Sequence, residues 1–231
     1  MNIQGLQTAR MGSKSIPNKN TLLVNGKPLY KNNLDNTRQC KLIENVFVST
    51  DIPQIIETEQ HVIVRPDYLC QDNSSHYDAI FHGLHEIDTR TGKFTDILVI
   101  ILGNALGAHP TIIDAAIQYM IDTPKVDSCM SVGEFNMFTP YRAYKENGEF
   151  LTTHIPQETI RDVKRTEDFN NKNAYEPSLF FNGSFWICRR RAIMDNNGLL
   201  PFPWLGHNIK PIHQSPEFQE LDAEWQLKMM Q

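Results

Sequence analysis

Cysteine is scarce in this sequence, and its spacing excludes one common class of metal site. The 231 residues contain four cysteines, which are far apart in the chain. Because no C-x-x-C pair occurs, neither a zinc ribbon nor a thioredoxin-type redox motif is expected. We expect reduced thiols in or near the core at all four positions, Cys40, Cys70, Cys129 and Cys188.

Long apolar runs are also missing. The longest one, ILVIIL at 97–102, is much shorter than the roughly 20 residues that a membrane-spanning helix needs. The first residues are polar, and Arg10 interrupts the chain before the apolar core of a signal peptide could form. The sequence therefore predicts no membrane partner and a cytoplasmic, reducing location.

Positive charge is not in excess. The net charge is −5 and the sequence pI is about 5.9, whereas a general nucleic-acid binder usually carries a basic surface. We therefore expect no nucleic-acid partner. At 40% hydrophobic and 21% charged residues, the chain can bury a core and is not expected to be disordered. Its length suits a single domain over residues 1–231.

Short apolar runs alternate with helical patterns over the first part of the chain. The run at 97–102 is apolar and rich in β-branched residues, as in a strand that is covered on both faces. Apolar residues within 74–87 recur every three or four positions, which predicts a helix. This alternation indicates an α/β fold with an open, mostly parallel sheet and helices on both faces. The predicted strands are 3–7, 44–50, 61–66, 96–103 and 126–134, and the predicted helices are 29–40, 74–87 and 110–122.

The segment 135–180 has a different character. It is rich in Thr, Asn, Glu, Lys and Tyr and has no regular hydrophobic period. We interpret it as a small insertion that serves as a lid, a dimerisation arm or both. A strand at 179–190 and a helix at 220–230 with an acidic start are predicted to follow it.

The loop TARMGSKSIPNKN, residues 8–20, concentrates positive charge in an acidic chain. Its glycine would let backbone N–H groups approach an anion, and its lysines and arginine would offset the charge. The loop is therefore a candidate cradle for a polyphosphate, and the alternative is a solvated basic loop. Neither G-x-x-x-x-G-K-[ST] nor G-x-G-x-x-G occurs, which argues against an ATPase-type P-loop and a dinucleotide dehydrogenase.

The pattern R-x-G-S-K-x-x-P-x-K-N at 10–20 resembles the signature of the acylneuraminate (CMP-sialic acid) cytidylyltransferase family. Several matches in one order are more specific than any single match. The further matches follow the family's order and are NGKPL at 25–29, VFVSTD at 46–51, VRPDYLCQDNSS at 64–75, FFNGSFWI at 180–187 and ELDAEW at 220–225.

The resemblance implies a Rossmann-like nucleotide-diphospho-sugar transferase fold. It also implies transfer of CMP from CTP to an acidic acceptor, with release of pyrophosphate. Lys19 and Arg10 would be catalytic, and Glu220 and Asp222 would hold Mg²⁺. The implied nucleotide-binding residues are Arg10, Gly12, Ser13, Lys14, Asn20, Arg65, Asp72, Ser74 and Ser75. The implied acceptor-binding residues are Gly103, Asn104, His109 and Asn182.

Two departures from the family pattern concern the acceptor and the metal. The family's LQPTSPLR is here LGNALGAHP at 102–110, so Gly103 replaces a glutamine and His109 replaces an arginine. This alters the predicted acceptor pocket. Glu220 stands where the family has the first aspartate of a D-x-D motif, and its carboxylate reaches about one methylene further.

The expected acceptor is a sugar acid of the sialic, legionaminic or pseudaminic type, and two alternatives stay open. One is the same transfer to a phosphonate or another non-sialic acceptor, which the altered 102–110 segment suggests. The other is a catalytically weakened nucleotide-binding homologue, which Glu220 suggests. The resemblance also implies a homodimer in which 135–180 reaches the partner. Histidines 76, 82 and 85 are predicted to be solvated or packing residues, although His82 and His85 share a helix face.

Overall fold

The computed structural model describes residues 1–12, 15–214 and 220–229, and it divides the chain into two compact units. The first unit contains the described residues of 1–131, 183–212 and 220–229. The second contains 132–182 together with His213 and Gln214. Across the described ranges, no helix is both long and apolar enough to cross a membrane.

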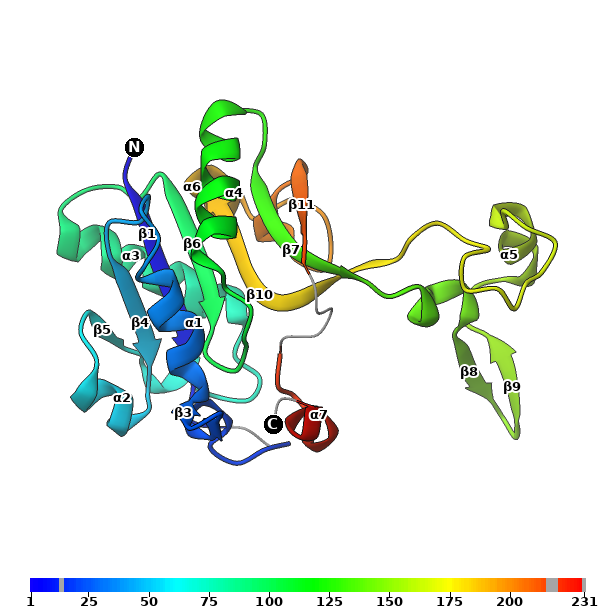
Figure 1. The fold of residues 1–231 in the computed structure, drawn as a ribbon, viewed down its shortest axis with the longest axis horizontal. Coiled ribbons are helices and arrows are strands. Elements are labelled where there is room, and N and C mark those ends of the chain that lie inside the picture. The colour runs from blue at the N-terminus through cyan, green and yellow to red at the C-terminus, as the bar shows by residue number, and fades with distance from the viewer. Residues whose placement is uncertain (13–14, 215–219, 230–231) are drawn as a thin grey trace. The chain divides into compact units, whose positions relative to one another are not determined.

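A seven-stranded sheet forms the centre of the fold, in the order β11-β7-β10-β6-β1-β4-β5 (Figure 1). Strands β6, β1, β4 and β5 are parallel, and β10 runs antiparallel to β6. The predicted α/β fold with a mostly parallel sheet is confirmed. The strands are β1 (Ile3–Ala9), β4 (Val46–Thr50), β5 (Val62–Val64), β6 (Ile97–Leu102), β7 (Ser128–Glu134), β10 (Leu179–Arg189) and β11 (Ile209–His213).

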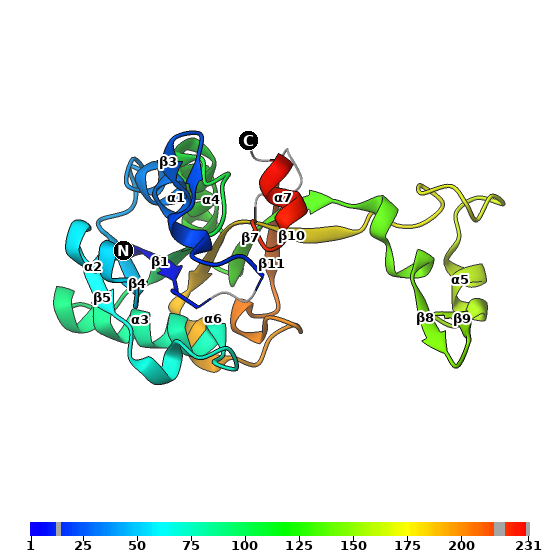
Figure 2. The same ribbon diagram turned by 90° about the horizontal axis from the view of Figure 1, so that it is seen from below.

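Helices cover both faces of this sheet. Figures 1 and 2 show α1 and α4 on one face and α3 and α6 on the other. A short two-stranded sheet of β2 (Leu23–Val24) and β3 (Lys27–Pro28) precedes α1. The helices of the first unit are α1 (Leu29–Thr37), α2 (Pro53–Thr58), α3 (His76–Thr91), α4 (Pro110–Asp122), α6 (Arg190–Asp195) and α7 (Glu224–Met229).

The β6 strand shows how the apolar sequence is used. Ile97, Val99 and Ile101 pack in one cluster with Ile113 and Ile117 of α4. The residues between them face the opposite side, because side chains alternate along a strand. All six residues of β6 are buried, as expected for a strand with helices on both sides.

Helix α3 is longer than its apolar pattern predicts. It continues to Thr91 and ends at Gly92, which has φ 66° and therefore a left-handed conformation that favours glycine. A second glycine, Gly83, lies inside the helix. A Cβ there would lie 2.6 Å from Cδ2 of the buried Leu6, so its absence lets α3 pack closely on β1.

The prediction that the last helix starts at residue 220 is wrong. Glu220 forms an isolated antiparallel bridge with Ala105, and α7 begins only at Glu224. The side-chain oxygen of Gln226 accepts hydrogen bonds from the backbone N–H groups of Asp222 and Ala223, both at 2.7 Å. The predicted helix therefore loses residues 220–223, because Glu220 pairs with Ala105 in the loop after β6.

The second unit contains the hairpin of β8 (Tyr144–Asn147) and β9 (Phe150–Thr153), and helix α5 (Gln157–Val163). Its small core includes Ile160 and Tyr175. The unit covers somewhat more than the predicted insertion at 135–180. Its role as a lid or dimerisation arm, and the homodimer itself, stay predictions.

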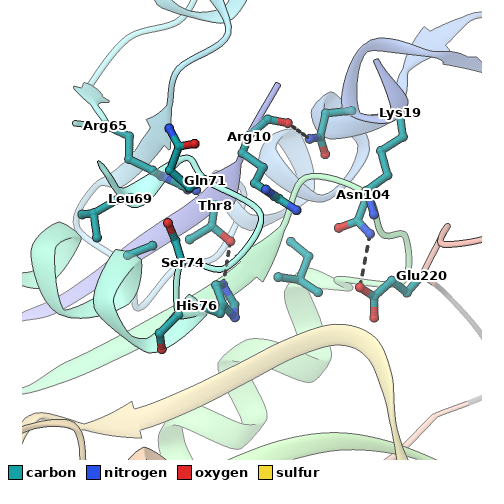
Figure 3. Close-up of a pocket in the computed structure, with 14 residues that line it drawn as sticks. Thr8, Arg10, Lys19, Arg65, Leu69, Gln71, Ser74, His76, Asn104 and Glu220 are labelled. Carbon is teal, nitrogen blue, oxygen red and sulfur yellow. Dashed lines mark hydrogen bonds between the residues drawn. The ribbon is translucent and has the colours of Figure 1, made fainter. Parts of the chain in front are cut away.

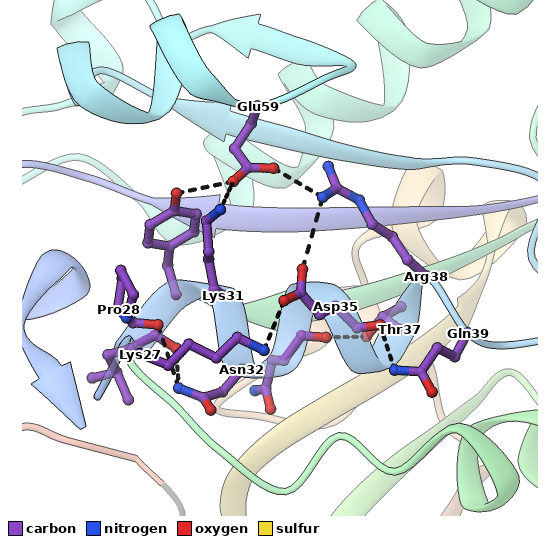
Figure 4. A network of polar contacts seen from close by, with 12 residues as sticks. Lys27, Pro28, Lys31, Asn32, Asp35, Thr37, Arg38, Gln39 and Glu59 are labelled. Atoms are coloured by element: carbon purple, nitrogen blue, oxygen red, sulfur yellow. Dashed lines mark hydrogen bonds and ion pairs between the residues drawn. The ribbon is translucent and has the colours of Figure 1, made fainter. Parts of the chain in front are cut away.

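A buried carboxylate ties α1 to the end of α2 (Figure 4). Glu59, whose side chain is 5% exposed, pairs with Arg38 at 2.8 Å and Lys31 at 3.3 Å, and it accepts a hydrogen bond from the Tyr30 hydroxyl at 2.9 Å. Burial by itself would raise the pKa of Glu59. The three hydrogen bonds outweigh it, and the pKa falls below its ordinary value of 4.5.

Replacing Glu59 with glutamine should lower the free energy of unfolding by roughly 1–3 kcal/mol at neutral pH, since hydrogen bonds to charged groups are lost. Because the folded pKa is depressed, the carboxylate stabilises the fold above its unfolded pKa and loses this effect as the pH falls through the folded value. The difference between wild type and variant should therefore shrink in acid. Urea unfolding at several pH values measures it. The exposed Glu57→Gln change on α2 is the control, and an equal loss there would contradict the assignment.

Candidate active site

A cavity of about 270 Å³ opens in the first unit, where β1 and β6 end (Figure 3). Thr8 and Arg10 come from the end of β1, Leu102 and Asn104 from the end of β6, and Glu220 from the C-terminal segment. The carboxyl ends of neighbouring parallel strands lie at one edge of a sheet, which is why ligands bind there in open α/β folds. The basic loop at residues 8–20 reaches this edge of the sheet directly, because it follows β1 in the chain.

Many of the residues singled out in the sequence meet at this cavity. Ser13 and Lys14 lie outside the described residues, and Gly12 lies beside Arg10. Asp72 reaches the cavity residues through an ion pair with Arg10. The predicted residues that line the cavity are Arg10, Lys19, Asn20, Arg65, Ser74, Ser75, Asn104 and Glu220.

Two cations from the basic loop point into the cavity. Arg10 donates from Nη1 to the Asp72 carboxylate at 3.1 Å and to the Cys70 carbonyl at 3.3 Å. Lys19 begins a 3-10 turn and places its Nζ 2.7 Å from the Asp222 carboxylate. Asn20 is buried and donates to the Arg10 carbonyl at 2.8 Å, which ties the two ends of the loop together.

A third cation lies deeper. Arg65 is 5% exposed and donates from Nε and Nη2 to the hydroxyl and carbonyl of Ser49, at 3.1 and 2.9 Å. Burial lowers the pKa of its guanidinium, but an arginine stays charged in proteins. Ser74 and Ser75 line the cavity beside it, and the Ser74 hydroxyl donates to the Tyr68 carbonyl at 2.7 Å.

Two carboxylates of the C-terminal segment, Glu220 and Asp222, lie at the Lys19 end of the cavity. The amide nitrogen of Asn104 lies 3.2 Å from the Glu220 carboxylate and 3.3 Å from that of Asp222. Gly183, with φ 93°, lets the backbone of Glu220 pack closely against β10, because a Cβ at residue 183 would lie 2.5 Å from the Glu220 Cβ. Burial and the neighbouring Asp222 raise the pKa of Glu220 to about 7, while Asn104 and Lys19 act in the opposite direction.

The donor set at this end suits a hard divalent cation. Mg²⁺ is typically bound by one or two carboxylates together with substrate phosphates. Glu220 and Asp222 provide two carboxylates that share one amide donor, and Glu220 is half-buried. Among the described residues no cluster of three or more His, Cys, Asp or Glu side chains that could hold a metal ion occurs.

The predicted acceptor-binding residues do not form one group. A Cβ at Gly103 would lie 2.8 Å from the Ala9 Cβ and 2.9 Å from the Asn20 side-chain oxygen, so this glycine makes room for the chain's own atoms. His109 precedes α4, its carbonyl accepts from the first turn, and it is absent from the described lining of the cavity. Asn182 belongs to the second unit, where it is buried and donates to Gln214 at 3.3 Å.

Several residues of the cavity were not expected from the sequence as site residues, and two of them, Thr8 and His76, contact each other. The Thr8 hydroxyl lies 3.0 Å from Nε2 of His76. Desolvation and the nearby Arg65 guanidinium lower the pKa of His76 below its ordinary value of 6.5. A usable signal was present, because Thr8 directly follows the predicted first strand at 3–7 and His76 directly follows the paired serines.

The cavity therefore combines cations on one side with carboxylates on the other. Such an arrangement can bind a polyphosphate together with a divalent cation. The arginines and the lysine would neutralise the phosphate charges, and the carboxylates would hold the cation. The Lys19–Asp222 ion pair shows that the two sides lie within direct contact distance. A solvated basic loop would not require this convergence.

Comparisons with known proteins agree with this geometry. Residues 6–178 match the family model described as Cytidylyltransferase. The chain is 25% identical to the CMP-N,N'-diacetyllegionaminic acid synthase of Legionella pneumophila, over 98% of this chain and 94% of that protein. It is 26% identical to the N-acylneuraminate cytidylyltransferase of Oncorhynchus mykiss, over 96% of this chain but only 48% of that protein.

The fold has matching solved structures as well. A CMP:2-keto-3-deoxy-manno-octonic acid synthetase complexed with CTP superposes with a TM-score of 0.68 at 18% identity, and the match covers 99% of this chain and 96% of the other. At this identity the likeness shows the fold alone, whereas the family model covers most of the sequence. The chain belongs to the cytidylyltransferase family.

Proposed function

We propose that this cytidylyltransferase transfers CMP from CTP to a sugar acid of the sialic, legionaminic or pseudaminic type and releases pyrophosphate. The observation that carries the proposal is the ion pair of Lys19, which lines the cavity together with Arg10 and Glu220, with the neighbouring Asp222 carboxylate at 2.7 Å. The Legionella synthase supports the acceptor class, because this chain spans 94% of its length.

The proposed reaction is a displacement at the α-phosphorus of CTP. A hydroxyl oxygen of the acceptor forms a new bond to this phosphorus, and its proton is released to water. The bond to the oxygen that bridges to the β-phosphate breaks, and pyrophosphate leaves with the electron pair. Catalysis of such a transfer consists mainly of positioning and charge stabilisation. Lys19 and Arg10 supply fixed positive charge for the triphosphate.

Glu220 and Asp222 are the proposed ligands of Mg²⁺. When bound, this ion would neutralise charge on the triphosphate oxygens. The nucleoside is assigned to the opposite part of the cavity, at Arg65, Ser74 and Ser75. These are groups with hydrogen-bond donors, and they line the cavity together with His76.

A second candidate is the same transfer to a phosphonate or another non-sialic acceptor. It is favoured by the segment after β6, where the glutamine and arginine of the family pattern are replaced. The amide of Asn104 is already engaged by the C-terminal segment, and His109 lies directly before α4. The acceptor must therefore be recognised by other groups than in the pattern of the family.

A panel of acceptors separates these candidates. The protein is incubated with CTP, Mg²⁺ and one acceptor at a time: N-acetylneuraminic, legionaminic, pseudaminic and 3-deoxy-manno-octulosonic acid, and a simple phosphonate. We expect pyrophosphate release and a CMP-linked product by mass spectrometry with a nine-carbon acid. Release with the phosphonate and with none of the sugar acids would establish the second candidate. CTP binding without turnover on any acceptor would indicate a weakened homologue.

A further inference from the structure

The loop after β6 is joined to the C-terminal segment by backbone and side-chain contacts. Ala105 bridges Glu220, and the Leu221 N–H donates to the Asn104 carbonyl at 2.8 Å. The side chain of Asn104 is directed at the same segment. Its Nδ2 lies 3.2 Å from the Glu220 carboxylate, 3.1 Å from the Leu221 carbonyl and 3.3 Å from the Asp222 carboxylate. Figure 3 shows the bond from Asn104 to Glu220.

All three neighbours of this amide nitrogen are acceptors, which fixes its orientation. Only the NH₂ group of an asparagine can serve them, and its two hydrogens must be shared among the three. Asn104 is 8% exposed, so water has little access to replace it. A neutral donor placed between two carboxylates offsets part of their mutual repulsion without competing with a cation for their charge.

We propose that Asn104 is a positioning residue that holds the carboxylates of Glu220 and Asp222 together for a divalent cation. This inference rests on the metal site of the proposed function and deepens it. Groups that hydrogen-bond to metal ligands orient them, and their loss typically costs about 10–100-fold in metal affinity. The extra methylene of Glu220 gives its carboxylate more freedom than an aspartate has. The amide of Asn104 restricts that freedom.

The sequence comparison gave Asn104 a different role, as an acceptor-binding residue. The contacts place its only donor group on the C-terminal segment instead. The residue lies in the segment 102–110 that departs from the family pattern, and its partner Glu220 is the second departure. The two departures are therefore in contact with each other, at 3.2 Å.

Mn²⁺ binding tests this proposal without any acceptor. CTP is present at the protein's concentration, and loss of the free Mn²⁺ signal in electron paramagnetic resonance is measured against the same concentration of CTP without protein, because CTP alone also binds Mn²⁺. Asn104→Ala should weaken Mn²⁺ binding about tenfold, within the usual range for such residues. The matched control is Asn45→Ala, which lies before β4 at the opposite edge of the sheet and should leave the affinity unchanged.

Further variants separate the possible failures. Asp222→Asn should weaken Mn²⁺ binding on its own. If it does not, the metal site of the proposed function is wrong. If Asp222→Asn weakens binding and Asn104→Ala does not, the positioning role alone is wrong. A double-mutant cycle of Asn104→Ala with Glu220→Gln should be non-additive, because the two side chains are in contact. Additive effects, or a loss of folding stability with unchanged Mn²⁺ affinity, would mean that Asn104 only anchors the C-terminal segment.

Discussion

Replacing Lys19 with alanine should lower kcat/KM for CTP about 100- to 1,000-fold, the range seen when one preorganised charge-stabilising donor is removed from an active site. Lys19 is the cation that the structure places closest to the candidate metal carboxylates, with Nζ 2.7 Å from Asp222. In the proposed reaction, negative charge grows on the phosphate oxygens, and no other lysine of the described residues lines the cavity. Steady-state pyrophosphate release measures the effect.

The same change should leave the fold nearly intact. The Asp222 side chain is 57% exposed, so it is solvated when its partner is removed, and ion pairs at such surfaces contribute only about 0–1 kcal/mol. Urea unfolding of Lys19→Ala should therefore match wild type within about 1 kcal/mol. Lys125→Ala, at an exposed position before β7, is the control for a lysine lost elsewhere. Wild-type turnover of Lys19→Ala would show that the catalytic cation lies at another residue.

The second large effect is expected for Asp222→Asn, which keeps the shape of the side chain and removes its charge. The variant should need a higher Mg²⁺ concentration for half-maximal rate and should lose about 10- to 100-fold in kcat/KM at a fixed, limiting Mg²⁺ concentration, since a carboxylate ligand is lost. The Asn side-chain oxygen can still accept a hydrogen bond from Lys19. The loss therefore reports on the metal more than on the ion pair.

A Mg²⁺ titration of the initial rate, at saturating CTP and acceptor, measures this change. Asp195→Asn, an exposed position at the end of α6, removes one negative charge elsewhere and should leave the titration unaltered. An Asp222→Asn protein with the wild-type Mg²⁺ requirement would remove this residue from the proposed metal site. The Mn²⁺ measurements on the same variant give an independent answer, because they need no turnover.

These two predictions depend on residues of opposite kinds. Lys19 belongs to a short basic motif whose meaning is local, since glycine and several cations within a few positions indicate an anion site in any fold. Asp222 has no such local signal. An acidic residue near the start of a helix is favoured by the helix dipole alone, so its spacing cannot distinguish a metal ligand from a helix end.

Much of the fold was predictable for the same local reason. The continuous apolar run of β6 and the three-and-four spacing within α3 report how each segment is buried, and strands that are buried on both faces are typical of a mostly parallel sheet between helices. Boundaries were less accurate. Helix α3 continues to Thr91 and ends only before Gly92, which adopts a left-handed conformation. Helix α7 starts only at Glu224, because Glu220 is paired with Ala105.

The sequence by itself determined the α/β class, the family and the basic loop at the carboxyl edge of the sheet, because hydrophobic period and short motifs act through neighbouring residues. Only the tertiary structure decided that Asn104 contacts Glu220 and Asp222, which are 116 and 118 positions away, and that Thr8 meets His76. Such contacts depend on the spatial order of the strands in the sheet, which brings distant segments of the chain together. That order is set by the packing of the whole sheet and leaves no trace in the spacing of any single segment.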